Sequence, residues 1–229
     1  MAVFMFGRGT PSKIAPVFSD NSWELIAKAC QMNKVPDSWV VGDYKNMTIN
    51  DKEYLVVIIA KNHDIYSDGT GTAPLTLQLI DCYETRYRMA SAQSNKVGWT
   101  NSEMRTVTLP AIMALMPIEV QEGIRAVNKM SSAGNRSSTI NTTADKLFLV
   151  SEVEVFGSTT YAAPGEGTRY QYYTQGVKRL KNLSGSAISW WLRSPTVEFD
   201  TTFCEVRDQG FIASSYSNEV SGVCPAFCF

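Results

Sequence analysis

The chain has 229 residues and a mass of 25.4 kDa, enough for one large domain or two small ones with a sizeable core. Hydrophobic residues make up 44% of it and aromatic residues 11%, a composition that argues against disorder. Its 21 basic and 22 acidic residues are interspersed and give a formal net charge of −1. The sequence therefore lacks the basic stripe of a nucleic-acid-binding protein and the Lys/Arg block of a membrane-surface protein.

Neither a membrane span nor an export signal is predicted. The longest apolar run, residues 54–60, is far shorter than the ~20 residues that cross a bilayer. Residues 1–9 lack a basic region before an apolar segment, so they do not resemble a signal peptide. The odd number of cysteines, without a regular framework, predicts free thiols and synthesis in a reducing cytoplasm.

Residues 1–19 combine Gly, Pro and Ser with apolar side chains that a solvated linker would not need. The apolar residues are Val3, Phe4, Met5, Phe6, Ile14, Val17 and Phe18. Two interpretations remain open: a short arm that docks on another chain, or the first strand of the domain. We divide the chain accordingly into residues 1–19, the arm, and residues 20–229, the domain.

Capping and turn residues predict the first elements. Residues 19–22 precede an amphipathic apolar pattern, which predicts a helix that ends near Asn33. Residues 45–49 and 53–60 flank Asn50-Asp51, a pair that tolerates the positive φ of a hairpin turn. The Asp- and Gly-rich residues 61–75 then predict a long loop.

The middle of the chain is predicted to be helical and then irregular. Asn101-Ser102 predicts the start of a helix, which Pro110 interrupts or restarts and which the apolar pattern extends to Ile124. Ser, Thr, Asn and Gly dominate residues 131–144, so a loop is predicted there. A buried strand over 146–150, continued by 153–156 after a bulge, precedes a loop over 157–167. A short helix is expected over 169–173.

Four short extended runs end the chain: 188–193, 202–207, 210–215 and 222–229. Trp190 and Trp191 are adjacent in the first run and point to opposite faces of a strand. Their strand therefore has layers on both sides, or leaves one aromatic ring for a partner. Pro225 predicts that the closing strand lies at an edge or bulge, because proline cannot donate to a central ladder. This mixture of helices and strands predicts an α+β fold.

Several residue groups together form a recognisable pattern. They are Asn62-His63-Asp64; Trp99 with Ser102, Met104 and Arg105; Asp145-Lys146-Leu147-Phe148-Leu149 with Ser151, Glu152 and Glu154; Gly165-Glu166-Gly167 with Tyr170; Trp191-Leu192-Arg193-Ser194-Pro195; and Gly222-Val223 with Pro225-Ala226-Phe227. Over roughly residues 38–229 the pattern resembles a family of uncharacterised domains found in gut-type anaerobic bacteria and in their phages and prophages. The ending also resembles the C-type-lectin-like fold of formylglycine-generating enzymes and of variable receptor-binding proteins of phages with diversity-generating retroelements.

The resemblance implies a compact C-type-lectin-like α+β domain whose exposed late loops bind ligands. One position departs from the family pattern, which usually has Arg before the proline where this chain has Cys224. If that Arg pairs with a buried carboxylate in the family, this chain must satisfy the carboxylate otherwise. We expect structural roles for five residues: Arg105, Glu152, Trp191, Arg193 and Pro225.

Oxygen-rich and imidazole side chains near residue 63 have a functional and a structural interpretation. His63 is the only histidine, which excludes a metal site built on several imidazoles. Beside Asp64 it has the chemistry to orient a Ser or Cys nucleophile, although such a pair more often stabilises a loop. Asn62, Asp64, Asp68 and residues 69–71 offer calcium-type oxygens without the Asp-x-Asp-x-Asp-Gly order, so a solvated turn-rich loop is favoured.

The remaining carboxylates are interpreted as structural. Gly165-Glu166-Gly167 is not followed by Lys-Ser or Lys-Thr and so is no phosphate loop. We expect Glu166 to form an internal ion pair with Arg169 or Arg193. Glu152 and Glu154 are expected on one face of a strand. There they resemble a paired acid–base, but their place after a buried strand favours ion pairs with Arg105 or Arg193.

The late segment has the composition of a binding loop. Residues 208–218 are rich in Tyr, Ser and Asn, and the surrounding aromatic residues exceed what one small core needs. An ordinary polar hairpin is the alternative. The ligand-binding residues we predict are Trp190, Asp208, Gln209, Tyr216 and Asn218.

These observations predict a non-enzymatic phage virion component, such as a fibre, collar or tail-associated decoration, made in the host cytoplasm. Residues 1–19 would attach it to other virion proteins as an oligomer, while loops 157–168 and 208–220 would face a host-surface glycan or protein. No cofactor, metal, nucleic acid or membrane insertion is expected. Two alternatives are a formylglycine-type modifying enzyme or its degenerate relative, using Cys204, Cys224 and Cys228, and a free-standing carbohydrate-binding module.

Overall fold

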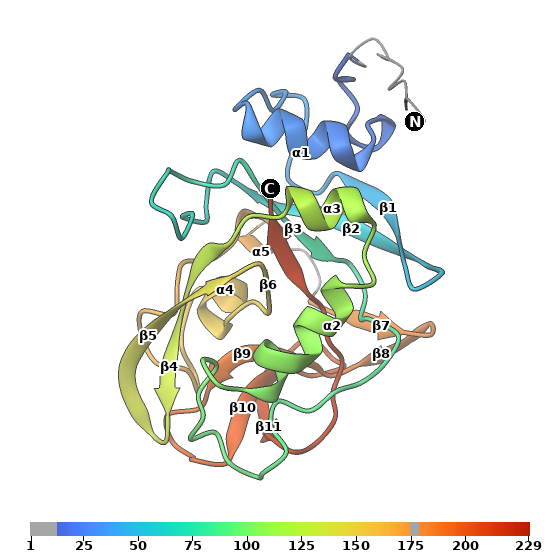
Figure 1. Cartoon of the computed structure of the whole chain (residues 1–229). Helices are drawn as coiled ribbons and strands as arrows, with labels where there is room; N and C mark the ends of the chain where they lie inside the picture. The colour runs from blue at the N-terminus through green and yellow to red at the C-terminus, as the bar shows by residue number, and fades with distance from the viewer. Residues whose placement is uncertain (1–12, 175–178) are drawn as a thin grey trace, which may run out of the picture.

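The computed structural model describes residues 13–174 and 179–229 (Figure 1). Its helical segments are η1 (Phe18–Asp20), α1 (Trp23–Gln31), the π-helical turn η2 (Met104–Thr108), α2 (Leu109–Met113), α3 (Ile118–Gly123), α4 (Glu152–Phe156) and α5 (Gln171–Thr174). Its strands are β1 (Tyr44–Ile49), β2 (Lys52–Lys61), β3 (Leu75–Leu79), β4 (Val127–Gly134), β5 (Ser137–Asp145), β6 (Leu147–Phe148), β7 (Lys181–Leu183), β8 (Ser186–Ile188), β9 (Trp190–Pro195), β10 (Thr202–Val206), β11 (Ile212–Tyr216) and β12 (Ala226–Cys228). Helices and antiparallel sheets are mixed along the chain, so the α+β class is confirmed.

Five strands form the central sheet, in the order β1-β2-β3-β12-β6, with antiparallel neighbours. The last strand, β12, therefore lies inside the sheet between β3 and β6. The prediction of an edge or bulge is wrong because Pro225 directly precedes β12 and needs no ladder donor there. Its carbonyl accepts a hydrogen bond from the Leu79 amide at 3.1 Å.

A second sheet, in the order β11-β10-β9, lies at the opposite end of the molecule from α1 (Figure 1). β9 connects it to the rest of the fold, because the Arg193 amide donates to the Val150 carbonyl at 3.0 Å and the Trp191 amide to the Gly222 carbonyl at 2.9 Å. Trp190 and Trp191 are both 0% exposed. The strand therefore has packed layers on both sides, the first of the two alternatives that the sequence left open.

Local signals explain the first helix and hairpin, both of which are confirmed. The Ser22 side chain caps α1 by accepting from the Leu25 amide at 3.2 Å. Asn50 and Asp51 turn the β1–β2 hairpin with φ values of 50° and 60°. α1 then packs closely on α3 at Gly123, where a Cβ would lie 2.6 Å from the Cβ of Ala27.

The described part of residues 1–19 packs on the domain. Phe18 is 1% exposed, and its ring makes edge contacts with Trp23 and Trp39 at centroid distances of 6.3 and 5.4 Å. Partly buried Ile14 packs against the same core. The apolar residues 3–6 lie outside the described residues. An attachment arm would therefore have to lie N-terminal to residue 13.

Residues 131–144 are not a loop, as the sequence predicted, but most of the β4–β5 hairpin. The two strands pair from Val127–Asp145 to Gly134–Ser137. The loop prediction is wrong because these polar residues include several threonines, which strands favour, and a two-stranded hairpin exposes one face. Figure 1 shows the hairpin running along one side of the molecule.

Residues 153–156 are helical, so the predicted continuation of the strand is also wrong. Ser151 Oγ accepts from the Glu154 amide at 3.1 Å, while the Glu154 carboxylate accepts from the Ser151 amide at 2.9 Å. This reciprocal arrangement is a capping box, and its Ser-x-x-Glu signature is legible in the sequence. Gly157 ends the helix with a φ of 77°.

The predicted short helix near residue 170 and the four late extended runs are all present, as α5 and β9 to β12. The predicted strand over 146–150 shortens to β6. Within residues 13–174 and 179–229, no helix combines the length and the apolar composition that a bilayer crossing requires.

Candidate functional site

Five charged side chains lie together in the interior, beside β4, α4 and β9. They are Asp64, Lys129, Glu154, Glu166 and Arg193, each at most 5% exposed. We call this group the charged core. A buried charge is costly unless it is paired and hydrogen-bonded, so the pairings within the group determine its chemistry.

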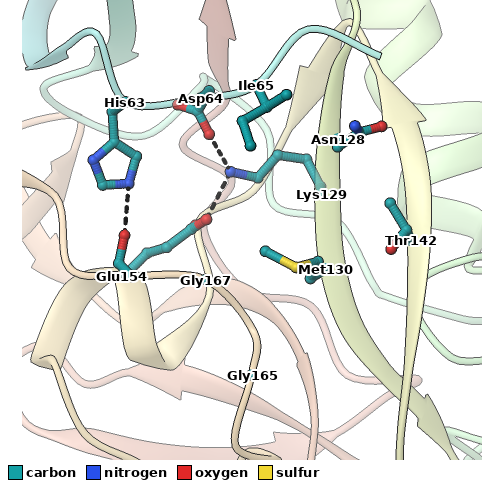
Figure 2. Close-up of a pocket in the computed structure, with 11 residues that line it drawn as sticks. His63, Asp64, Ile65, Asn128, Lys129, Met130, Thr142, Glu154, Gly165 and Gly167 are labelled. Atoms are coloured by element: carbon teal, nitrogen blue, oxygen red, sulfur yellow. Dashed lines mark hydrogen bonds and ion pairs between the residues drawn. The ribbon is translucent and has the colours of Figure 1, made fainter. Parts of the chain in front are cut away.

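The Lys129 ammonium lies between two carboxylates (Figure 2). Its Nζ is 2.7 Å from Asp64 Oδ1 and 2.6 Å from Glu154 Oε1, and it donates to the Tyr170 hydroxyl at 2.8 Å. These three contacts use all three ammonium donors. Burial acts to raise the pKa of the Asp64 carboxyl, but the Lys129 ammonium and the Thr76 hydroxyl outweigh it and hold that pKa below its usual value.

Arg193 holds Glu154 from the other side. Its guanidinium bonds both carboxylate oxygens of Glu154, with 2.9 Å between Nη2 and Oε1. Its remaining donors reach the carbonyls of Met130, Leu149 and Glu166. Burial acts to raise the pKa of Glu154, but Arg193 and Lys129 outweigh it and the pKa is lowered. The predicted pairing of Arg193 with this pair of glutamates is thus confirmed for Glu154.

Glu166 has a different environment. Its carboxylate accepts from the Ser132 amide at 2.8 Å and bonds the Ser194 hydroxyl, while Arg193 reaches only its main-chain carbonyl. The predicted ion pair of the Glu166 carboxylate with Arg193 or Arg169 is therefore wrong. Because burial dominates, the pKa of Glu166 is raised to about 7.

A cavity of about 400 Å³ opens beside the charged core (Figure 2). Its lining residues are His63, Asp64, Ile65, Asn128, Lys129, Met130, Thr142, Glu154, Gly165, Gly167 and Thr168. The charged groups in this lining already bond to one another, because the Lys129 ammonium donates to the carboxylates of Asp64 and Glu154. The arrangement therefore joins β4 to α4 through buried ion pairs.

His63 and Asp64 have different hydrogen-bond partners. His63 Nε2 lies 3.2 Å from the Thr168 hydroxyl, and its ring packs on Tyr170 at a centroid distance of 4.5 Å. Asp64 instead bonds Lys129. The loop-stabilising interpretation of His63 is the one that this geometry supports.

The oxygen-rich loop over 61–75 does not converge on a cation. Asp64 is 5% exposed, so its prediction as part of a solvated loop is wrong. Asp68 is exposed and pairs with Arg125 at 2.6 Å. Among the described residues, no group of three or more His, Cys, Asp or Glu side chains is placed to hold a metal ion.

Glu152 holds the N-terminal part of the loop over 157–168. Its buried carboxylate accepts from three successive main-chain amides, those of Thr160, Tyr161 and Ala162, the last at 2.7 Å. Glu166 anchors the other end of the same loop through Ser132 and Ser194. This loop is therefore presented on a rigid base.

The other residues predicted to be structural are also placed in the core or in ion pairs. Arg105 Nε lies 2.6 Å from Asp145 Oδ1, so its partner is neither Glu152 nor Glu154. Trp99 donates to the second oxygen of Asp145 at 2.8 Å. Trp191 is buried and donates to the Tyr87 carbonyl at 2.7 Å.

All five cysteines are buried free thiols. Cys224, at the position where the resemblance predicts an arginine, contacts Cys82, with 2.9 Å between the two sulfurs. Cys204 contacts Glu152, and Cys228 contacts Asp64 and Thr76. Burial raises the pKa of Cys204, Cys224 and Cys228 well above the usual value, which keeps these thiols protonated.

A second cavity, of about 300 Å³, lies at the late loops and is mostly polar. Its lining residues are Arg86, Ala187, Ile188, Ser189, Glu205, Arg207, Asp208, Ser215, Glu219, Val220 and Ser221. We call it the late-loop pocket. The pocket lies between the β7–β8 hairpin and the β10–β11 hairpin. Buried Ser217, next to β11, forms hydrogen bonds with residues 89–94.

Of the five predicted ligand-binding residues, Asp208 lines this pocket. Gln209, Tyr216 and Asn218 are exposed on the same loops but outside its lining. The β10–β11 register places Tyr216 on the face opposite Glu205. Trp190 lies fully in the core, where it donates to the Arg179 carbonyl at 3.0 Å, so its ring offers no surface to a ligand.

Sequence reasoning missed Glu205 and Arg86, which the fold brings to the late-loop pocket from separate segments. It also missed Lys129, because residues 125–130 were assigned to no element and the start of β4 was not recognised. Alternation along β4 would have placed Lys129 on the same face as the buried Val127 and Ser131.

The fold and its charged core define an α+β domain stabilised by internal ion pairs. The chain belongs to the family described as a domain of unknown function, DUF6273, which matches residues 64–229. No curated protein and no solved structure matches the chain significantly.

Proposed function

We propose that this chain is a non-enzymatic component of a phage particle that binds a receptor on the host surface through its late loops. Its domain would be C-type-lectin-like. The observation that carries the binding role is the late-loop pocket, an open polar cavity framed by two hairpins. The resemblance of its motifs to phage and prophage domains supports the proposal that the chain is part of a phage particle.

The charged core supports a structural rather than catalytic use of the reactive side chains. Lys129 donates to Asp64, Glu154 and Tyr170. Arg193 donates to Glu154 and to three carbonyls. Neither side chain needs a substrate to complete its bonding. A rigid base of this kind holds loops in place without taking part in binding.

Attachment to the particle would use the residues N-terminal to the packed segment. Phe18 already belongs to the core, so the attachment segment is confined to residues 1–12. Repetition on a particle would add avidity, so that a weak individual site suffices.

Peptide mass spectrometry of density-gradient-purified particles tests this proposal. We expect the chain at a fixed ratio to the capsid protein. A chain lacking residues 1–12 should stay folded but be lost from particles, whereas the full chain supplied in the same way should be incorporated. Absence of the full chain from clean particles would remove the virion role.

The Cys82–Cys224 contact favours a second candidate, a formylglycine-type modifying enzyme. Two thiols 2.9 Å apart are a starting point for redox chemistry. Burial of both thiols, and the raised pKa of Cys224, make this the weaker proposal. Thiol titration with and without copper separates the two: an enzyme should show a reactive, metal-sensitive pair in the native state.

A further inference from the structure

We propose that the late-loop pocket binds a saccharide, with the Glu205 carboxylate as the central acceptor for its hydroxyl groups. This inference rests on the proposed function and adds a ligand class and a site to it. It is carried by one buried carboxylate and by the mixture of charges around it.

Glu205 is 2% exposed, yet its carboxylate has little hydrogen bonding. Oε2 lies 3.2 Å from the Ser221 hydroxyl, which also donates to the Ser189 carbonyl at 2.7 Å. Oε1 is 3.0 Å from Arg207 Nη1, close enough for an ion pair, but it receives no hydrogen bond within the described residues. A buried carboxylate oxygen without a hydrogen bond is costly, so a donor supplied by a ligand would be favourable.

The pocket around Glu205 offers both donors and acceptors. Its carboxylates are Glu205, Asp208 and Glu219, and its guanidiniums are Arg86 and Arg207. Ser215 donates to Glu219 at 2.7 Å and is part of the same lining. Nearly balanced charge disfavours a strongly anionic ligand such as a phosphate ester.

Saccharide hydroxyls suit this lining because each hydroxyl both donates and accepts. Carboxylates would accept from them and guanidiniums would donate to them. A polyamine would satisfy the carboxylates but would leave Arg86 facing a like charge. Val220 and Ile188 add small apolar contacts of the kind that a sugar ring covers.

The β10–β11 register supports the same face for the site. Residues 203, 205, 213 and 215 alternate onto one side of the hairpin. The Arg207 amide donates to the Phe211 carbonyl at 2.8 Å, which extends the pairing by one step toward the turn and brings Phe211 toward the same side, and this residue is 68% exposed. Carbohydrate rings stack well on such aromatic faces, so Phe211 would flank the site.

The test uses the purified full chain on an array of bacterial surface oligosaccharides. The oligosaccharide with the strongest signal is then titrated by calorimetry, with spermidine as the cationic probe. We expect saturable saccharide binding that Glu205→Gln weakens by about tenfold or more, because a charge-assisted hydrogen bond is lost. Glu198→Gln makes the same chemical change at an exposed site outside the pocket and should leave the affinity unchanged.

Arg86→Ala keeps the proposal falsifiable if Glu205→Gln does not fold. Arg86 is exposed, so its removal should spare the fold and still weaken saccharide binding. No saccharide binding would overturn the inference, as would binding that neither variant weakens. Binding of spermidine in place of saccharides would assign the pocket to cations instead.

The outcome also separates this inference from the proposed function. A chain found in particles that binds no saccharide would refute the pocket assignment alone. A chain that binds saccharide through Glu205 but is absent from particles would refute the virion role alone. That second result would fit a free-standing carbohydrate-binding module.

Discussion

Lys129 of β4 and Glu154 of α4 form a buried ion pair with 2.6 Å between Nζ and Oε1. Both side chains are 2% exposed, and Asp64 holds the ammonium from the other side at 2.7 Å. The pair joins the β4–β5 hairpin to the helix that precedes the loop over 157–168. It therefore belongs to the support of the loops and not to their binding surface.

Removing the Lys129 charge should destabilise the fold strongly. Lys129→Met leaves two carboxylates facing each other in the core, and loss of one partner of a buried pair costs roughly 3–5 kcal/mol. Urea unfolding followed by fluorescence measures the loss. Lys96→Met is the matched control, because the exposed Lys96–Asp200 pair at 3.7 Å should contribute no more than about 1 kcal/mol. Equal effects of the two changes would contradict the role given to Lys129.

The raised pKa of Glu166 predicts that the folded state loses stability as the pH rises toward neutrality. Its pKa is raised from 4.5 to about 7 in the fold, so the folded state binds the proton more tightly than the unfolded chain does. Stability should therefore fall between pH 4.5 and 7, by roughly 3 kcal/mol from this group. Urea midpoints across this range should show the slope in the wild-type chain. Glu166→Gln, which resembles the protonated side chain, should flatten it, and an unchanged slope would exclude Glu166 as its source.

Asp64 and Glu154 predict a separate loss in acid. Their folded pKa values lie below the ordinary values of 3.8 and 4.5, so their stabilisation is present above those values. It should disappear as the pH falls below about 4, when the carboxylates become protonated and Lys129 and Arg193 lose their partners. Asp64→Asn should remove part of this acid transition while leaving the slope between pH 4.5 and 7. If it abolishes the higher slope instead, the assignment of the two windows is wrong.

The sulfur contact predicts one disulfide. Diamide should accept two hydrogen atoms from Cys82 and Cys224, forming the S–S bond and a hydrazine, because the two sulfurs lie 2.9 Å apart. Peptide mapping after alkylation in denaturant should show the Cys82–Cys224 link with Cys30, Cys204 and Cys228 alkylated. Cys82→Ser should abolish the link. A Cys224–Cys228 link would contradict this geometry.

The burial of Phe18 predicts which N-terminal changes reduce the free energy of unfolding. Deleting residues 1–12 should leave the free energy of unfolding nearly unchanged. Phe18→Ala should reduce it by about 3–5 kcal/mol, because the ring fills a pocket between Trp23 and Trp39. Thermal unfolding of both variants checks this, and a neutral Phe18→Ala change would mean that the segment is not part of the core.

Much of the fold could be predicted because its signals are local. The Ser22 cap, the Asn50-Asp51 turn and the alternation of Trp190 and Trp191 each depend on neighbouring residues. The capping box at Ser151 was equally local, but it was hidden by β-branched neighbours that also suit a strand.

Apart from the pairing of Arg193 with Glu154, the charged core could not be predicted because its contacts are long-range. Lys129 lies 65 residues from Asp64 and 25 from Glu154, and only the fold brings them together. Glu205 gave no signal for the same reason, since its environment comes from Arg86, Ser189 and Ser221. The composition of 208–218 drew attention to the segment beside the late-loop pocket, but of the five predicted residues Asp208 alone is part of the pocket lining.

Host binding through the late-loop pocket is tested most directly by the adsorption of phage particles to host cells in the presence of the purified chain. If the late-loop pocket binds the host, the wild-type chain should block adsorption and Glu205→Gln should block it at least tenfold less well, whereas Thr168→Val, at the other cavity, should block it fully. Blocking that depends on Thr168 and not on Glu205, or no blocking by a folded wild-type chain, would contradict host binding through this pocket.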